Sequence, residues 1–94
     1  MDLEFEWDEE KRAYNIREHK VDFRYVVLIF NNAILEEIND RDNYGEERII
    51  AYGHIEGTVY RVVYTMRGKT FRLISAQKAE RHDQERYYKT VFHG

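Results

Sequence analysis

The side chains best suited to chemistry in this sequence are one early histidine, two adjacent glutamates and several widely spaced cations. Histidine is the residue type whose ordinary pKa lies closest to neutral pH, so His19 could act as a general base or acid. Glu46 or Glu47 could share that work. The cations that could hold a phosphate are Lys11, Arg48 and Arg72. Together these residue types are typical of metal-free RNA cleavage, in which a ribose 2′-OH attacks the adjacent phosphorus while cations stabilise the phosphoryl oxygens.

The same residues have structural interpretations, which the sequence leaves open. A histidine late in a helix often complements the helix dipole or caps carbonyl groups. Arg48 and Arg72 could pair with carboxylates across a sheet, and a tyrosine-rich sheet is commonly core or interface. An interaction module without catalysis therefore stands beside the nuclease hypothesis.

Composition excludes several other classes of site. The chain has no cysteine, which rules out disulfides, thiolate zinc sites and cysteine nucleophiles. Ser75 is the only serine and lies in no nucleophile motif, and the glycines form no nucleotide-binding loop. The histidines lack the spacing of metal ligands. We therefore expect neither a metal nor a cofactor.

The length of 94 residues fits one domain, 1–94, with a single core. The net charge of −3 hides an asymmetry between the two ends of the chain. Residues 1–60 hold 15 Asp and Glu against 7 Lys and Arg, whereas residues 61–94 hold 3 against 8. The basic C-terminal third predicts an anion-binding surface, although the two parts could instead attract each other within the fold.

The chain carries no obvious targeting or membrane signal. Its longest strongly apolar run covers residues 25–30, far short of the roughly 20 residues that a spanning helix needs. The acidic N-terminus lacks the basic start and apolar stretch of a signal peptide. We expect a cytoplasmic protein without membrane contact.

The first third of the chain predicts a strand and two helices. Apolar and acidic residues alternate over residues 2–7, which favours a strand, and Asp8 can then cap a helix that runs to about His19. Asp22 can cap a second helix, because apolar residues recur at helical spacing over residues 23–30. The β-branched and aromatic content of that segment keeps a strand open as the alternative.

The rest of the chain predicts hairpins and a final helix. The expected strands cover residues 33–38, 48–54, 59–66 and 69–75. A loop is expected at 39–46, and tight turns at Glu56-Gly57 and Arg67-Gly68. Ser75 can cap a last helix over residues 76–90.

These elements predict an α+β fold. An antiparallel sheet of sequential hairpins would carry two N-terminal helices and one C-terminal helix on one face. The other face would be partly open. Arg61 or Arg72 pointing out of that face would place cations on a concave, aromatic-lined surface.

Three collinear segments of this sequence resemble the BrnT toxin family. Phe5-Glu6-Trp7-Asp8, followed by Lys11, Asn15, His19, Val21 and Phe23, resembles the opening pattern of that family. Gly45-Glu46-Glu47-Arg48 with Gly53 resembles its central G-E-x-R segment. Residues 72–79, which read Arg-Leu-Ile-Ser-Ala-Gln-Lys-Ala and are followed by Tyr87, resemble its R-I-I-S-A-R-x-A segment.

The resemblance implies a RelE-like fold and a ribonuclease toxin of a type II toxin–antitoxin system, which cuts RNA and inhibits growth. The catalytic residues that it implies are His19, Glu47, Arg48 and Arg72. The cations expected to contact RNA are Lys11, Lys20, Lys78 and Arg81. The implied partner is a BrnA-like antitoxin, which would neutralise the toxin and bring the complex to operator DNA. The expected assemblies are a homodimer or a 2:2 toxin–antitoxin complex.

The sequence departs from the family pattern at three positions. Glu18 stands where the family usually has lysine, Lys20 where it has glycine, and Gln77 where it has arginine. Glu18 repels RNA, and Gln77 removes one phosphate contact. The alternative function is therefore a catalytically weak or inactive interaction module that binds an antitoxin and acts in autorepression of its operon.

Overall fold

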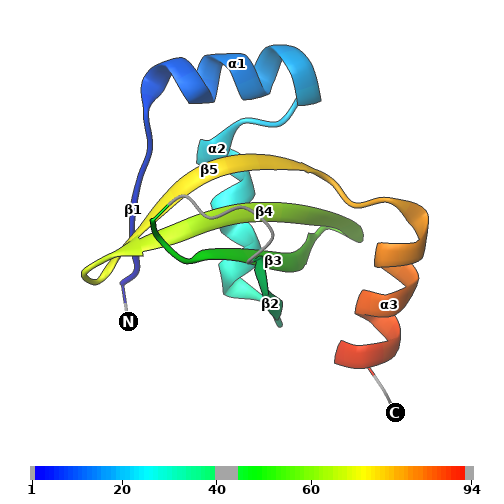
Figure 1. Ribbon diagram of the computed structural model, residues 1–94. Coiled ribbons are helices and arrows are strands. Elements are labelled where there is room, and N and C mark those ends of the chain that lie inside the picture. The colour runs from blue at the N-terminus through cyan, green and yellow to red at the C-terminus, as the bar shows by residue number, and fades with distance from the viewer. Residues whose placement is uncertain (1, 40–44, 93–94) are drawn as a thin grey trace.

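A five-stranded mixed sheet forms the centre of the protein (Figure 1). The computed structural model describes residues 2–39 and 45–92. The strands lie in the order β1-β5-β4-β3-β2. Their bounds are Glu4–Glu6 for β1, Leu35–Asn39 for β2, Arg48–Ile55 for β3, Thr58–Arg67 for β4 and Thr70–Lys78 for β5. The predicted loop at 39–46 lies largely outside the described residues.

The predicted antiparallel hairpins are confirmed for β3, β4 and β5, but β1 departs from the expected pattern. β1 pairs with β5 in parallel, so that Phe5 lies opposite Phe71 and Glu6 opposite Arg72. The two strands are far apart in the sequence, and a strand that is joined to its neighbour through helices can lie parallel to it.

The helices begin at the predicted caps. α1 spans Glu9–His19, and its first turn is capped by Asp8, whose side chain accepts from the backbone N–H of Glu10. α2 spans Phe23–Val26 and is capped in the same way by Asp22. A 3-10 helix, η1, continues it over Val27–Asn31. The helical prediction for residues 23–30 is therefore confirmed against the strand alternative.

The last helix begins later than predicted. β5 continues through Ser75 to Lys78, and α3 spans Arg81–Val91 with Glu80 at its N-cap. Ser75 is therefore a strand residue and not a cap. The segment from Ser75 to Lys78 lies in register with β4 from Val63 to Tyr60, and this pairing outweighs the local capping preference of serine.

The helices pack on both faces of the sheet, and not on one face as predicted. On one face, which we call the helical face, α2 and η1 bury residues such as Val26 and Ile29 against Val62 and Leu73. On the opposite face, α3 buries Tyr87, which belongs to a second core cluster with Ile50, Tyr52, Val59, Val63 and Ala79. In Figure 1, α1 lies over the β5 side of the sheet and α3 lies at one end of the strands. Because α3 lies at one end of the strands, part of this opposite face carries no helix of the described chain (Figure 1).

Two local features shape the strands. Glu56 and Gly57 both have positive φ, 49° and 86°, which is the backbone of the tight hairpin turn predicted there. In β5, Leu73 lies opposite Tyr64 but Ser75 lies opposite Val63, so Ile74 is an extra residue. No helix in the described part of the chain has both the length and the apolar character needed to span a membrane.

Candidate active site

The two predicted catalytic arginines, Arg48 and Arg72, lie on the same face of the sheet. Phe71 and Leu73 pack into the helical-face core, so the intervening Arg72 points to the other side. Arg48 precedes Ile49, which also packs on the helical face. We call the side that carries Arg48 and Arg72, together with Arg61, the arginine face.

Arg48 and Arg72 flank Thr65 in a row across three strands. Thr65 lies directly opposite Arg72 on β5. On its other side, the register of Ile49 with Tyr64 places Arg48 next to Thr65. The Thr65 hydroxyl donates to the backbone carbonyl of Glu47 at 2.7 Å, which ties the beginning of β3 to β4. We call Arg48, Thr65 and Arg72 the arginine row.

Arg72 is oriented by an ion pair with β1. Its Nη1 lies 2.7 Å from Oε2 of Glu6, the residue opposite it in the parallel register. Both side chains are partly exposed. An ion pair of this kind contributes little to stability, but it restricts the rotamers of the arginine and holds its guanidinium next to β1.

Arg61 lies on the arginine face in a cavity next to α3. It lies on β4 two residues from Val59 and two from Val63, which belong to the second core, so its side chain points to the same face. It lines a cavity of about 390 Å³ with Ile50 and Tyr52. Burial raises the pKa of the Tyr52 phenol, while a hydrogen bond from Arg61 opposes that rise. The prediction that Arg61 or Arg72 would place a cation on the face opposite the N-terminal helices therefore holds for both residues.

Glu47 lies at the beginning of the arginine row. It is exposed and immediately precedes β3, so it is the sequence neighbour of Arg48. Glu46, the other candidate, pairs with Arg67 at 3.7 Å near the end of β4. Of the two glutamates, Glu47 is therefore the one that lies next to the arginine row.

His19 and Lys11 line a second hollow, which we call the edge groove. β1 ends opposite Arg72, and α1 lies beyond it along the uncovered edge of β5. The groove has a volume of about 370 Å³, and its lining residues include Lys11, Tyr14, His19, Ile74 and Ser75. Two carboxylates, Asp8 and Glu10, lie in the same lining, so the groove is mixed in charge.

His19, the last residue of α1, lines the edge groove beside Ile74 and Ser75 of β5. These two residues follow Arg72 by two and three positions, and Arg72 is not among the described residues of the groove lining. A general acid or base must lie within hydrogen-bond reach of the proton that it moves. That His19, Arg48 and Arg72 share one centre therefore stays a prediction.

The other predicted RNA contacts are spread along the β5 side and the α3 junction. Lys20 has positive φ, and its Nζ donates to the backbone carbonyl of Arg17 at 2.7 Å, which closes the end of α1. Lys78 is exposed at the end of β5. Arg81 opens α3 and pairs with Glu85 at 3.6 Å. Across residues 2–39 and 45–92, no group of three potential metal-ligating side chains is found.

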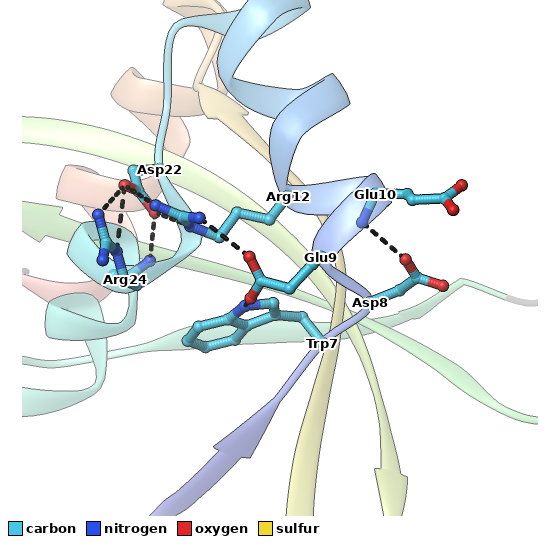
Figure 2. A network of polar contacts seen from close by, with 7 residues as sticks. All are labelled: Trp7, Asp8, Glu9, Glu10, Arg12, Asp22 and Arg24. Atoms are coloured by element: carbon cyan, nitrogen blue, oxygen red, sulfur yellow. Dashed lines mark hydrogen bonds and ion pairs between the residues drawn. The ribbon is translucent and has the colours of Figure 1, made fainter.

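A polar network that the sequence did not suggest fixes α1 against α2 (Figure 2). Arg12 belongs to a segment that reads as a solvated helix face, yet its side chain is only 18% exposed. It donates to both oxygens of Asp22, at 2.8 and 3.0 Å, and to Glu9 at 3.0 Å. Glu9 also accepts from the indole N–H of Trp7 at 2.7 Å. The hydrogen bonds from Arg12 hold the pKa of the Asp22 carboxyl well below its usual range.

Asn15 makes the second link between α1 and the sheet. Its Nδ2 donates to the carbonyls of Val21 and Ala76, both at 2.8 Å, and its Oδ1 accepts from the N–H of Ala76 at 3.0 Å. The side chain thus pairs with the edge of β5 where a neighbouring strand would otherwise lie. Asn15 and the Arg12 network together position the wall of the edge groove.

Comparisons with known proteins agree with this architecture. A family model described as the ribonuclease toxin BrnT of type II toxin–antitoxin systems matches residues 7–83. The fold is similar to that of the Brucella abortus ribonuclease toxin BrnT, whose crystal structure has a resolution of 1.1 Å. That similarity has a TM-score of 0.62 and 23% sequence identity, and it covers 85% of this chain and 100% of the other. None of the curated protein sequences matches this chain.

Proposed function

This chain belongs to the BrnT family of ribonuclease toxins of type II toxin–antitoxin systems, and we propose that it cleaves RNA without a metal at the arginine row. The observation that carries the proposal is the placement of Arg48 and Arg72 in one row on a sheet face, with Arg72 oriented by Glu6. Two guanidinium groups can bind the non-bridging oxygens of one phosphate and stabilise the charge that develops there.

The reaction that this arrangement supports is an intramolecular transesterification at the phosphate. The ribose 2′-oxygen forms a bond to phosphorus while the bond from phosphorus to the 5′-oxygen breaks. The products are a 2′,3′-cyclic phosphate and a 5′-hydroxyl. Glu47, beside Arg48, takes the proton of the 2′-OH, and a proton from a neighbouring acid or water reaches the departing 5′-oxygen.

The edge groove is proposed to hold the RNA strand next to the cleaved bond. Lys11 supplies a positive charge there, and the imidazole of His19 can donate a hydrogen bond to a phosphate oxygen. We assign His19 to this binding site because it lines the groove with Lys11, and proton transfer to the departing 5′-oxygen by His19 is the alternative that the variants below test. Lys20, Lys78 and Arg81 extend the cationic contacts beyond the groove.

The test is an RNA cleavage assay in excess EDTA with the parent and three variants. We expect Arg72→Ala to lower the rate by about 10²–10³, because a donor that stabilises transition-state charge is worth that much. His19→Ala should lower the rate far less, because it removes a contact to bound RNA and not a donor that stabilises transition-state charge. Arg24→Ala is the matched control, because Arg24 is an exposed arginine on α2.

Three results would overturn the assignment. Cleavage by the parent that occurs without EDTA and is lost in excess EDTA would show that a metal takes part. Equal and complete loss in the His19→Ala and Arg72→Ala variants would place both residues at one centre. Full activity of Arg72→Ala would remove the arginine row from catalysis.

A second candidate function rests on Gln77, which lines the same cavity as Arg61. The family pattern has an arginine at that position, so the arginine face lacks one cation here. Glu18 is paired with Arg17 at 3.5 Å and adds an acid near His19. A catalytically weak protein that binds its antitoxin and serves operon autorepression would cut no RNA in the assay above, and Gln77→Arg would increase its cleavage.

The proposed partner is a BrnA-like antitoxin that blocks RNA from the arginine face, in a 2:2 complex or with a toxin homodimer. Operator DNA would be contacted only by that complex. We propose a cytoplasmic location, where RNA and the antitoxin are both present. Purification together with the antitoxin encoded beside this chain tests the partnership.

A further inference from the structure

A second row of polar side chains lies on the arginine face, on the α3 side of the arginine row. Arg61 on β4 lies opposite Tyr52 on β3 and opposite Gln77 on β5. It therefore occupies the middle of three adjacent strands, as Thr65 does in the arginine row. We call Tyr52, Arg61 and Gln77 the second row.

The second row lines the cavity of about 390 Å³ beside α3, a volume typical of small-molecule sites. The acidic and imidazole side chains that line it with the row are Glu37, Glu80, His82 and Asp83. Ile50 is the one residue of the described lining without a polar side chain. Glu80 and His82 are exposed, so the cavity opens to solvent beside them.

The cavity begins next to the arginine row. Ile50 is two residues from Arg48 on β3, and Arg61 is four residues from Thr65 on β4. At the rise of an extended strand, these separations are roughly 7 and 13 Å. A nucleotide that adjoins a phosphate on the arginine row can therefore reach the cavity. The cavity is distinct from the edge groove, because the two share no residue of their described linings.

Arg86 neutralises two of the acids in the lining. It lies 3.3 Å from Glu37 and 3.4 Å from Asp83, and its guanidinium lies over the ring of Tyr52 at 5.0 Å from the centroid. Glu80 differs from these two acids. It stands at the N-cap of α3, and its side chain makes no capping hydrogen bond within the described helix. The Glu80 carboxylate can therefore accept hydrogen bonds from a ligand at the opening of the cavity.

This mixture of donors and acceptors suits a neutral base and not a second phosphate. The described lining holds three carboxylates against one guanidinium, that of Arg61, so a phosphate would be repelled. The acids do not form a cation site either, since no group of three potential metal ligands is found in the described chain. A guanidinium has five N–H donors, and its hydrogen bond to Tyr52 leaves others for a ligand.

Guanine is the base whose edges match these groups. Its O6 and N7 accept two hydrogen bonds, and arginine is the residue that most often donates to them. Its N1–H and 2-amino groups are donors that a carboxylate can accept from. The exposed ring of His82, beside Glu80, offers a surface on which a base can stack.

We propose that the cavity is a guanine subsite, in which Arg61 donates to O6 and N7 and Glu80 accepts from the opposite edge of the base. This inference rests on the proposed function, because it assigns the base next to the phosphate that the arginine row holds. The arginine row then sets where the chain is cut, and the second row sets which sequence is preferred.

The test measures binding of short 2′-O-methyl oligouridine, which cannot be cleaved because its attacking hydroxyl is blocked. A strand with one guanine should bind the parent about 5- to 100-fold more tightly than strands with adenine, cytosine or uracil at that position, because a bidentate contact discriminates by this factor. Strands with 7-deazaguanine, which lacks N7, or with hypoxanthine, which lacks the 2-amino group, should each lose part of the preference.

Two variants assign the two edges of the base. Arg61→Met should remove the difference between guanine and 7-deazaguanine, and Glu80→Ala should remove the difference between guanine and hypoxanthine. Arg24→Met and Glu85→Ala are the matched controls, since both residues are exposed and lie outside the described lining, and they should keep both differences. Circular dichroism checks the fold of Arg61→Met, and the exposed position of Glu80 makes its variant an independent test.

The outcomes separate the subsite from the nuclease. Equal or absent binding of all four strands by the parent would overturn the guanine subsite, and cleavage of RNA by the same protein would leave the nuclease proposal intact. A parent that prefers guanine but cuts no RNA would keep the subsite and overturn the proposed function. A guanine preference that both Arg61→Met and Glu80→Ala retain in full would overturn the assignment to this cavity.

Discussion

Asn15→Ala should cost this small domain a large part of its stability. The Asn15 side chain is 2% exposed and makes three hydrogen bonds, which join α1 to the edge of β5 and to the chain after α1. A hydrogen bond of this kind contributes about 1 kcal/mol, and a buried partner left without its bond costs about 1–3 kcal/mol more. We expect the free energy of unfolding to fall by about 3–4 kcal/mol.

This decrease is large compared with the whole free energy of unfolding of such a domain. A domain of this length has about 5–14 kcal/mol of stability at typical values per residue. A loss of about 3 kcal/mol corresponds to a fall in Tm of about 12–24 °C for a domain of this size. Urea unfolding followed by circular dichroism measures the change, and the m-value should stay constant because the same surface is exposed.

A matched control separates this buried role from the general effect of removing an asparagine. Asn32 is exposed, and within the described residues its side chain makes one hydrogen bond, from Nδ2 to the carbonyl of His54 at 2.9 Å. Asn32→Ala should therefore cost less than about 1 kcal/mol. If Asn15→Ala also costs less than about 1 kcal/mol, the side chain does not join α1 to β5 in the way we describe.

Three further perturbations follow from the packing and the charges. Pairing with Arg12 lowers the pKa of Asp22 in the folded state, so this stabilisation is present above the unfolded pKa, about 4, and is lost as the pH falls below it. Asp22→Asn should lower stability at pH 7 and flatten the acid side of the pH–stability curve; an unchanged curve would contradict the pairing. Gly53→Ala should lower the free energy of unfolding by about 1–3 kcal/mol, because the new Cβ would lie 2.7 Å from the Cβ of Ile29. If denaturant unfolding gives the same free energy for this variant and the parent, η1 can move away and the reasoning is wrong. Tyr87→Phe should cost about 1–2 kcal/mol, since the buried hydroxyl donates to a backbone carbonyl at 2.7 Å, and thermal unfolding at or above the parental Tm would refute this.

Local chemistry made most of the elements predictable. Asp8 and Asp22 cap the helices that the sequence predicts, since a capping side chain bonds to a backbone N–H only two residues away. The Glu56-Gly57 turn and the hairpin around it follow from the backbone conformation that such a turn requires. The family resemblance was visible for the same reason, because its motifs are short and collinear. The catalytic roles of His19, Glu47, Arg48 and Arg72 stay predictions.

The sequence by itself determined where the first two helices begin and that residues 48–75 form antiparallel hairpins. Only the tertiary structure decided that β1 lies parallel to β5, that Ser75 belongs to a strand, and that α3 covers the face opposite α2. It also decided that His19 and Lys11 line one groove beside β5. The physical reason is the sequence separation between the residues whose contacts decide each feature. Caps and turns depend on neighbours in the chain, whereas the side of a sheet that a helix covers depends on contacts between residues that are dozens of positions apart.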